Sequence, residues 1–159
     1  MAMDKIPMTT HGHQKLKEEL ARLKTKERPK VVEAIEEARA HGDLSENAEY
    51  DAAKEKQGFI EGRIREIQGK LAQAEVIDPT SLSGDRVVFG ATVTIYDFEA
   101  DEEFTYQIVG DDESDIKENK ISYASPIARA LIGKSIGEEA TIRAPKGDRQ
   151  VEVMDVEFK

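Results

Sequence analysis

The chain has 159 residues, and 23 Lys and Arg stand against 33 Asp and Glu, which gives a formal net charge of −10. Because cysteine is absent, a disulfide framework and a thiolate metal site are both excluded, and a reducing cytoplasm is the expected compartment. The sequence contains no run of 18 apolar residues, so no membrane-spanning helix is expected. The N-terminal residues lack the apolar core of a signal peptide.

A first long helix is predicted from about Thr10 to His41. Thr9 and Thr10 are candidate N-caps, and leucine recurs with the 4-3 spacing of a coiled-coil seam at positions 16, 20 and 23. Pro29 has no N–H and clashes with the preceding turn, so we expect a kink or a restart near Arg28. Gly42 is placed to end the helix.

A second helix is predicted from about Leu44 to Val76. Its seam has the spacing 4-3-4-3 through Ile60, Ile64, Ile67, Leu71 and Ala74, and the same register runs back through Gln57 and Ala53. Three glycines interrupt this helix, and we expect them to allow close approach of the two helices; they are Gly58, Gly62 and Gly69. Two antiparallel helices of about 30 residues span about 45 Å.

The turn of this hairpin carries two acids, Asp43 and Glu46. Their spacing is that of a capping box, in which Asp43 would cap the second helix and Glu46 would reach back. With the nearby cations Arg39 and Lys54, the same acids would also suit a metal ion and a phosphate chain. The two interpretations are compatible. Because two-metal chemistry needs several carboxylates in a dry cavity, we expect another macromolecule to complete the site.

The second half of the chain is predicted to be a small antiparallel sheet with one helix. Alternating β-branched and aromatic residues predict strands at 91–98, 104–109, 140–144 and 150–158. A capped helix is predicted from Ser125 to Gly133. The fold class is therefore α+β, with a coiled-coil hairpin at 1–79 and a second domain at 80–159. Most of the negative charge, −8 of the −10, lies in residues 79–159, which disfavours free duplex DNA as a partner of that half.

Several segments resemble the GreA/GreB family of bacterial transcript cleavage factors. They are Ile6–Thr9, the tip string Ala38–Tyr50, the return-helix string Gly58–Ile64, and Ser125–Lys134. The resemblance covers essentially the whole chain, and Leu44 after the tip aspartate favours the GreA branch over GreB. It implies a second domain like that of FK506-binding proteins, which docks on RNA polymerase. It also implies that the hairpin enters the secondary channel of the polymerase.

The resemblance also assigns roles to particular residues. Asp43 and Glu46 would help to hold a Mg²⁺ ion shared with the polymerase, whose own cleavage of backtracked RNA they would stimulate. The chain itself would not be an enzyme, and no metal is expected on the isolated chain. Arg39 and Lys54 would contact the nascent RNA 3′ end, while docking would involve the segment with Pro126, Ile127 and Arg129. No membrane association is expected, and the free protein is expected to be a monomer.

Two other function classes compete with this interpretation. The segment from Ala130 to Ile142 is similar to part of an FK506-binding-protein prolyl isomerase, but such enzymes need an aromatic-lined pocket and this half lacks tryptophan. A structural coiled-coil adaptor would need Asp43 and Glu46 only for capping. A structural zinc site is disfavoured, because the three histidines, His11, His13 and His41, are too scattered for a metal motif.

Overall fold

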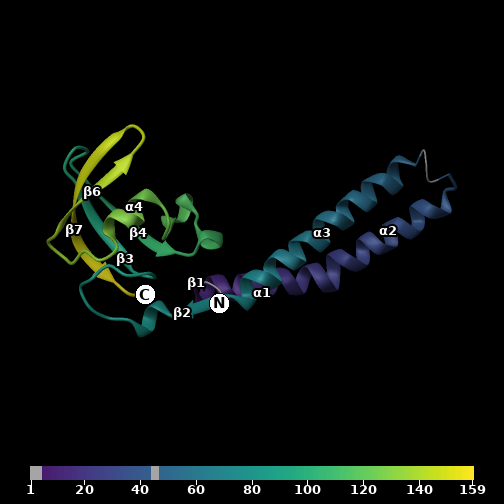
Figure 1. Cartoon of the computed structure of the whole chain (residues 1–159), viewed down its shortest axis with the longest axis horizontal. Helices are drawn as coiled ribbons and strands as arrows, with labels where there is room; N and C mark the ends of the chain where they lie inside the picture. The colour runs from purple at the N-terminus through teal and green to yellow at the C-terminus, as the bar shows by residue number, and fades with distance from the viewer. Residues whose placement is uncertain (1–4, 44–46) are drawn as a thin grey trace. The chain divides into compact units, whose positions relative to one another are not determined.

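The computed structural model describes residues 5–43 and 47–159 (Figure 1). The chain divides into two compact units. The first comprises Gln14–Gln73, and the second combines the N-terminal segment as far as His13 with Ala74–Lys159. The N-terminal segment thus groups with the second unit, although the sequence-based division assigned it by chain position to the first.

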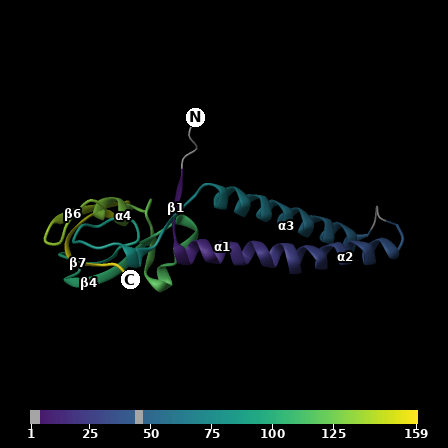
Figure 2. The same cartoon turned by 90° about the horizontal axis from the view of Figure 1, so that it is seen from below.

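The first unit is a helical hairpin. Helix α1 (Thr10–Arg22) continues through the π-helix η1 (Leu23–Glu27) into α2 (Arg28–Ala40), and α3 (Ala48–Ala72) returns antiparallel to them. Figures 1 and 2 both show α2 and α3 lying side by side. At 25 residues and 1.5 Å per residue, α3 is about 38 Å long, somewhat shorter than the 45 Å expected from the sequence.

The two sides of the hairpin bury one narrow apolar seam. On α3 the buried residues are Ala53, Ile60, Ile64 and Ile67, which confirms the predicted 4-3 register. On the outgoing side they are Leu16, Leu23, Val31, Ile35 and Ala38. The step from Leu23 to Val31 is eight residues instead of the seven of a heptad, so this side contains one extra residue.

The π-helix accommodates that extra residue. A π-turn closes its hydrogen bond over five residues, and here the N–H of Arg28 donates to the carbonyl of Leu23. Pro29 then stands at the second residue of α2, directly after the π-turn. A kink or a restart was predicted near Arg28; a new α-helical segment does begin there, although the backbone stays helical through Glu27 and Arg28. The effect of the π-helix is to return the apolar residues to the face that meets α3.

Two bidentate ion pairs join the helices on either side of the π-helix. The guanidinium of Arg28 lies 2.9 Å from Glu61, and that of Arg63 lies 2.6 Å from Glu19. The hydrogen bond from Arg63 lowers the pKa of Glu19, and the same bond raises the pKa of Arg63. These pairs are partly exposed, so they fix the register of the helices more than they stabilise the fold.

A two-stranded parallel sheet was not predicted from the sequence. Strand β1 (Ile6–Thr9) pairs with β2 (Ala74–Ile77), so the second helix ends at Ala72 and not near Val76 as predicted. The residues of β2 continue the helical apolar pattern, and tertiary pairing overrides it. Helix α1 begins at the predicted place, because the Thr9 hydroxyl accepts a hydrogen bond from the N–H of Gly12 at 3.1 Å.

The second unit is built on a five-stranded sheet. Its strands are β3 (Thr92–Asp97), β4 (Glu102–Val109), β5 (Lys120–Ser122), β6 (Glu139–Ala144) and β7 (Gly147–Glu157), in the order β5-β4-β3-β7-β6. The four predicted strands are confirmed and pair antiparallel. The short strand β5 was missed, and it pairs parallel with β4, so the sheet is mixed and not purely antiparallel.

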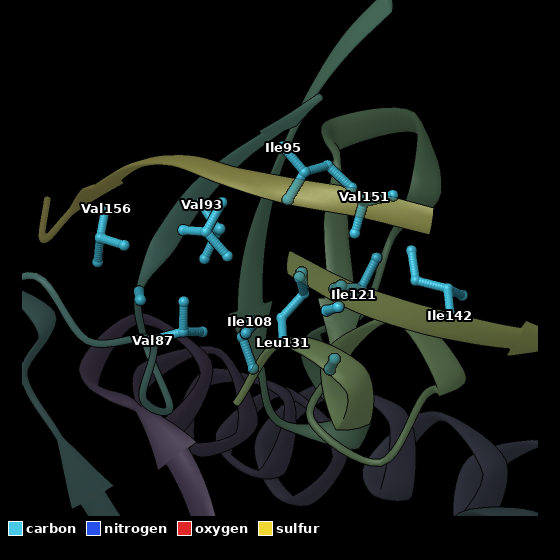
Figure 3. Close-up of a cluster of buried hydrophobic side chains, with 13 residues drawn as sticks. Val87, Val93, Ile95, Ile108, Ile121, Leu131, Ile142, Val151 and Val156 are labelled. Atoms are coloured by element: carbon cyan, nitrogen blue, oxygen red, sulfur yellow. The ribbon is translucent and has the colours of Figure 1, made fainter. Parts of the chain in front are cut away.

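Helix α4 (Pro126–Leu131) closes the core of this sheet. Its Ala128 and Leu131 are fully buried in the core of this unit. Figure 3 shows Leu131 among valine and isoleucine side chains of the strands. The predicted cap is present, since the hydroxyl of Ser125 accepts from the N–H of Ala128 at 3.2 Å. Within the described residues, no helix combines the length and apolar character needed to cross a membrane.

The three glycines of α3 do not serve close helix packing. A Cβ added at Gly58, Gly62 or Gly69 would meet nothing within 4 Å, so the expectation of close approach at these glycines is wrong. Replacing each by alanine should therefore raise the free energy of unfolding by about 1 kcal/mol, measured by chemical denaturation. Gly12→Ala is the matched control, because its Cβ would overlap the Glu113 carboxyl group; moving that group would break its bonds from the N–H groups of Thr9 and Gly110, so stability should fall. Destabilisation by all three α3 variants would contradict this account.

Candidate functional site

The hairpin tip joins the end of α2 to the start of α3. The final turn of α2 closes at His41, and Gly42 follows with φ +111°, a conformation that favours glycine. This confirms Gly42 as the residue that ends the helix. Asp43 comes next and is exposed, while Glu46 lies outside the described residues. The tip therefore presents at least one carboxylate to solvent at the turn.

Helix α3 is capped by Asn47, not by Asp43. The side-chain oxygen of Asn47 accepts from the N–H of Tyr50 at 3.0 Å, and the helix begins at Ala48. Asp43 stands four residues before this cap, so the prediction that Asp43 caps α3 is wrong, and the Glu46 half of the predicted capping box lies outside the described residues. Capping of α3 therefore gives no reason for an acid at position 43.

The predicted RNA-contacting cations lie on the two sides of the hairpin near this tip. Arg39 is exposed in the last turn of α2. Lys54 is exposed in the second turn of α3, where its ammonium donates to Gln57 at 3.3 Å. One further contact crosses the tip, from His41 Nδ1 to Glu49 Oε2 at 3.3 Å, and both side chains are largely exposed. The tip thus carries charge of both signs.

A magnesium ion would find few ligands here. Among the residues that the structure describes, no three His, Asp or Glu side chains gather closely enough to hold a metal. The exposed carboxylate of Asp43 is the kind of oxygen ligand that Mg²⁺ prefers, but magnesium keeps an octahedral set of oxygens. The remaining ligands would have to come from water or from a partner.

The second unit contains an apolar pocket of about 350 Å³ that was not predicted from the sequence. Its floor and walls come from the sheet and from the start of α4, and the lining includes Ile95, Phe104, Tyr106, Ile121, Ile127 and Ile142. Ile116, which is 69% exposed, lies at its edge. Alternation along each strand shows which residues face inward, but it cannot show that the inward face is left partly open.

A buried carboxylate forms the polar wall of this pocket. Asp97 is 1% exposed; it accepts from the N–H groups of Glu99 at 3.0 Å and Ala100 at 3.1 Å and pairs with Arg149. Burial alone would raise the pKa of Asp97, but these hydrogen bonds and the Arg149 charge hold it below its usual value. Arg149 also lies over the ring of Phe104, 6.0 Å from its centroid. Its guanidinium is thus held in place at the pocket.

The predicted docking residues do not all lie together. Pro126 and Ile127 line the pocket, with Pro126 exposed and Ile127 packed against the core. Arg129 is exposed on the same helix but is not among the pocket's lining residues. The pocket therefore brings together two of the three residues.

Comparison with known proteins identifies the family. Residues 6–76 match the family described as "Transcription elongation factor, N-terminal", and residues 82–158 match "Transcription elongation factor, GreA/GreB, C-term". The chain belongs to the GreA/GreB family of transcription elongation factors. This confirms the resemblance found in the sequence.

Individual relatives agree with the GreA branch. Transcription elongation factor GreA of Methylococcus capsulatus is 62% identical and covers 98% of this chain and 99% of its own length. GreA of Ralstonia nicotianae is also 62% identical with the same coverage. Among solved structures, the GreA factor homolog Gfh1 of Thermus thermophilus is 26% identical, covers 96% of this chain and 98% of its own, and has a TM-score of 0.44.

Proposed function

We propose that this GreA/GreB family member stimulates the intrinsic RNA cleavage of bacterial RNA polymerase. The hairpin would enter the secondary channel and bring Asp43 and Glu46 to the polymerase active site. The observation that carries this proposal is the position of Asp43, an exposed carboxylate at the turn of a hairpin whose return helix is about 38 Å long. A hairpin of that length is suited to deliver an acidic group at a distance from its own domain.

The tip carboxylates would act on backtracked RNA together with the polymerase. A Mg²⁺ ion held jointly with polymerase carboxylates would stabilise charge and activate the attacking water. This chain's part is to supply oxygen ligands and to accept a hydrogen bond that orients the water. Hydrolysis would leave a new RNA 3′ end aligned with the polymerase active site. The polymerase would be the catalyst, and this chain would stimulate it.

The pocket of the second unit would dock this chain on the polymerase. Pro126 and Ile127 line an apolar cavity whose polar wall is Asp97 and Arg149, and concave apolar sites with a few fixed polar groups suit specific recognition. A prolyl isomerase is the competing use of this pocket. It is disfavoured because Phe104 and Tyr106 are the only aromatic residues among its lining residues. The protein is proposed to act in the cytoplasm and to be a monomer when free.

The tip acids are tested by substitution. Asp43→Ala and Glu46→Ala should each lower stimulated RNA cleavage at least about 100-fold, because each removes a group that acts directly on the reaction. Since Asp43 does not cap α3, the free energy of unfolding should change by less than about 1 kcal/mol. Cleavage is measured on a stalled, backtracked elongation complex. Asp51→Asn, which changes an exposed acid in the first turn of α3, is the control and should cleave normally. Parental cleavage by Asp43→Ala would favour the structural adaptor instead.

The cations behind the tip are tested by crosslinking. We propose that Arg39 and Lys54 contact phosphates of the extruded RNA, so their contribution should weaken as salt is raised. A photoreactive group at the RNA 3′ end should crosslink to the tip region of the parental protein. The crosslink should be lost in Arg39→Glu/Lys54→Glu. An unchanged yield would mean that both residues are ordinary solvated flanks of the hairpin.

The docking pocket is tested with the full-length chain. Ile127→Asn should raise the concentration for half-maximal cleavage at least about 10-fold, since it puts a polar group in an apolar anchor site. The cleavage rate at saturating protein should stay unchanged, because the tip is intact. Ile136→Asn is the matched control, as Ile136 is an exposed isoleucine of the same unit that does not line the pocket. Equal half-maximal concentrations for both variants would refute docking through this pocket.

A further inference from the structure

One side chain links the two helix ends at the hairpin tip. The carboxamide oxygen of Asn47 accepts from the N–H of Tyr50 at 3.0 Å, in the first turn of α3. Its carboxamide nitrogen donates to the carbonyl of Ala38 at 2.6 Å, in the last turn of α2. Asparagine is suited to this place because one planar group carries both an acceptor and a donor.

Both hydrogen bonds satisfy backbone groups at the ends of helices. The first N–H groups and the last carbonyls of a helix have no partner within it. Ala38 is the last buried residue of the seam on α2, only 2% exposed, and among the described residues its carbonyl also receives a 3.2 Å bond from the N–H of His41. The shorter bond from Asn47 therefore satisfies a buried acceptor, and both hydrogen bonds of Asn47 are partly buried.

A second contact across the tip, between His41 and Glu49, is weaker. His41 and Glu49 lie 3.3 Å apart, but their side chains are 62% and 72% exposed, so solvent screens their attraction. The link through Asn47 is neutral and partly buried, so salt and pH should hardly affect it. Of these two contacts, the link through Asn47 is the one that can hold the helix ends at a fixed separation.

We propose that Asn47 is a positioning residue for the carboxylate of Asp43 at the tip. It fixes the separation of the α2 and α3 ends, and thereby the point from which Asp43 is presented, four residues before it. The proposal rests on the proposed function, since it concerns the geometry of that same tip. A displacement of about 1 Å in a reacting group can lower a rate about 100-fold, so a loosened tip should react slowly even when fully docked.

The deciding variant is Asn47→Ser. Serine keeps the acceptor for the N–H of Tyr50, because serine caps helices as well as asparagine does. Its side chain is too short to reach the Ala38 carbonyl, so this variant removes the link and keeps the cap. The rate of stimulated cleavage at saturating protein should fall about 10- to 100-fold. The concentration for half-maximal cleavage should stay within about twofold, because docking takes place elsewhere.

The matched control breaks another contact between the same two helices. Glu61→Gln weakens the ion pair between Glu61 on α3 and Arg28 on α2, which lies away from the tip. It should change the melting temperature only slightly, because the pair is partly exposed, and it should leave the saturated cleavage rate unchanged. A merely structural role of Asn47 would give that same result for Asn47→Ser, and so would overturn the proposal. If Asn47→Ser does not fold by circular dichroism, Asn47→Asp replaces it, since aspartate caps equally well and has no N–H to donate.

A second measurement reports the tip without the polymerase. The chain has no cysteine, so Glu37→Cys and Glu55→Cys provide two unique exposed sites for spin labels on α2 and α3. The distance distribution between the labels should broaden in Asn47→Ser and stay narrow in Glu61→Gln. An unchanged distribution overturns the link. If the parental protein fails to stimulate cleavage, the proposed function is wrong. The positioning role is then wrong as well, whatever distance distribution the labels show.

Discussion

The hairpin depends on keeping one apolar seam in line along two helices. A pair of helices buries a single stripe, so an error in its register would expose apolar side chains of that stripe. Helix α3 follows a strict 4-3 repeat, whereas the outgoing side spaces Leu23 and Val31 by eight residues. The π-helix between them resolves the mismatch, because its wider turn takes up one residue without turning the stripe away. Pro29 fits directly after it, and the ion pairs of Arg28 and Arg63 hold the register on each side.

Much of this architecture follows from local sequence signals. The 4-3 spacing predicts the seam of α3, Pro29 predicts the restart, and alternation predicts four strands, because each pattern reflects which side chains a regular backbone turns inward. The missed features depend on contacts between distant segments. Strand β2 has residues that continue a helical pattern, and only its pairing with β1 makes it a strand. The short strand β5 has too few residues to show a period.

The candidate site also has features that the sequence predicts and features that only the fold reveals. Its acids were predicted from their place between two helices, but the role of Asn47 was not, since Asp43-x-x-Glu46 also fits a capping box. A helix start can be moved by a few residues without changing the apolar pattern, so the sequence alone does not choose between Asp43 and Asn47 as the cap. The pairing of Asp97 with Arg149 is equally hidden, because 52 positions separate the two residues and only the fold of the sheet brings them together.

An exposed acid at the end of a hairpin has a consequence for the proposed function. In water, a carboxylate attracts a cation 4 Å away by only about 1 kcal/mol per unit charge, too little to hold Mg²⁺ on its own. The same carboxylate becomes a far stronger ligand once a partner excludes water and adds its own charges. The free chain would therefore be inert toward RNA, and its acids would act only inside a site that another protein completes. Rigid presentation then matters more than acidity, because the tip has to match a geometry that the partner has already set.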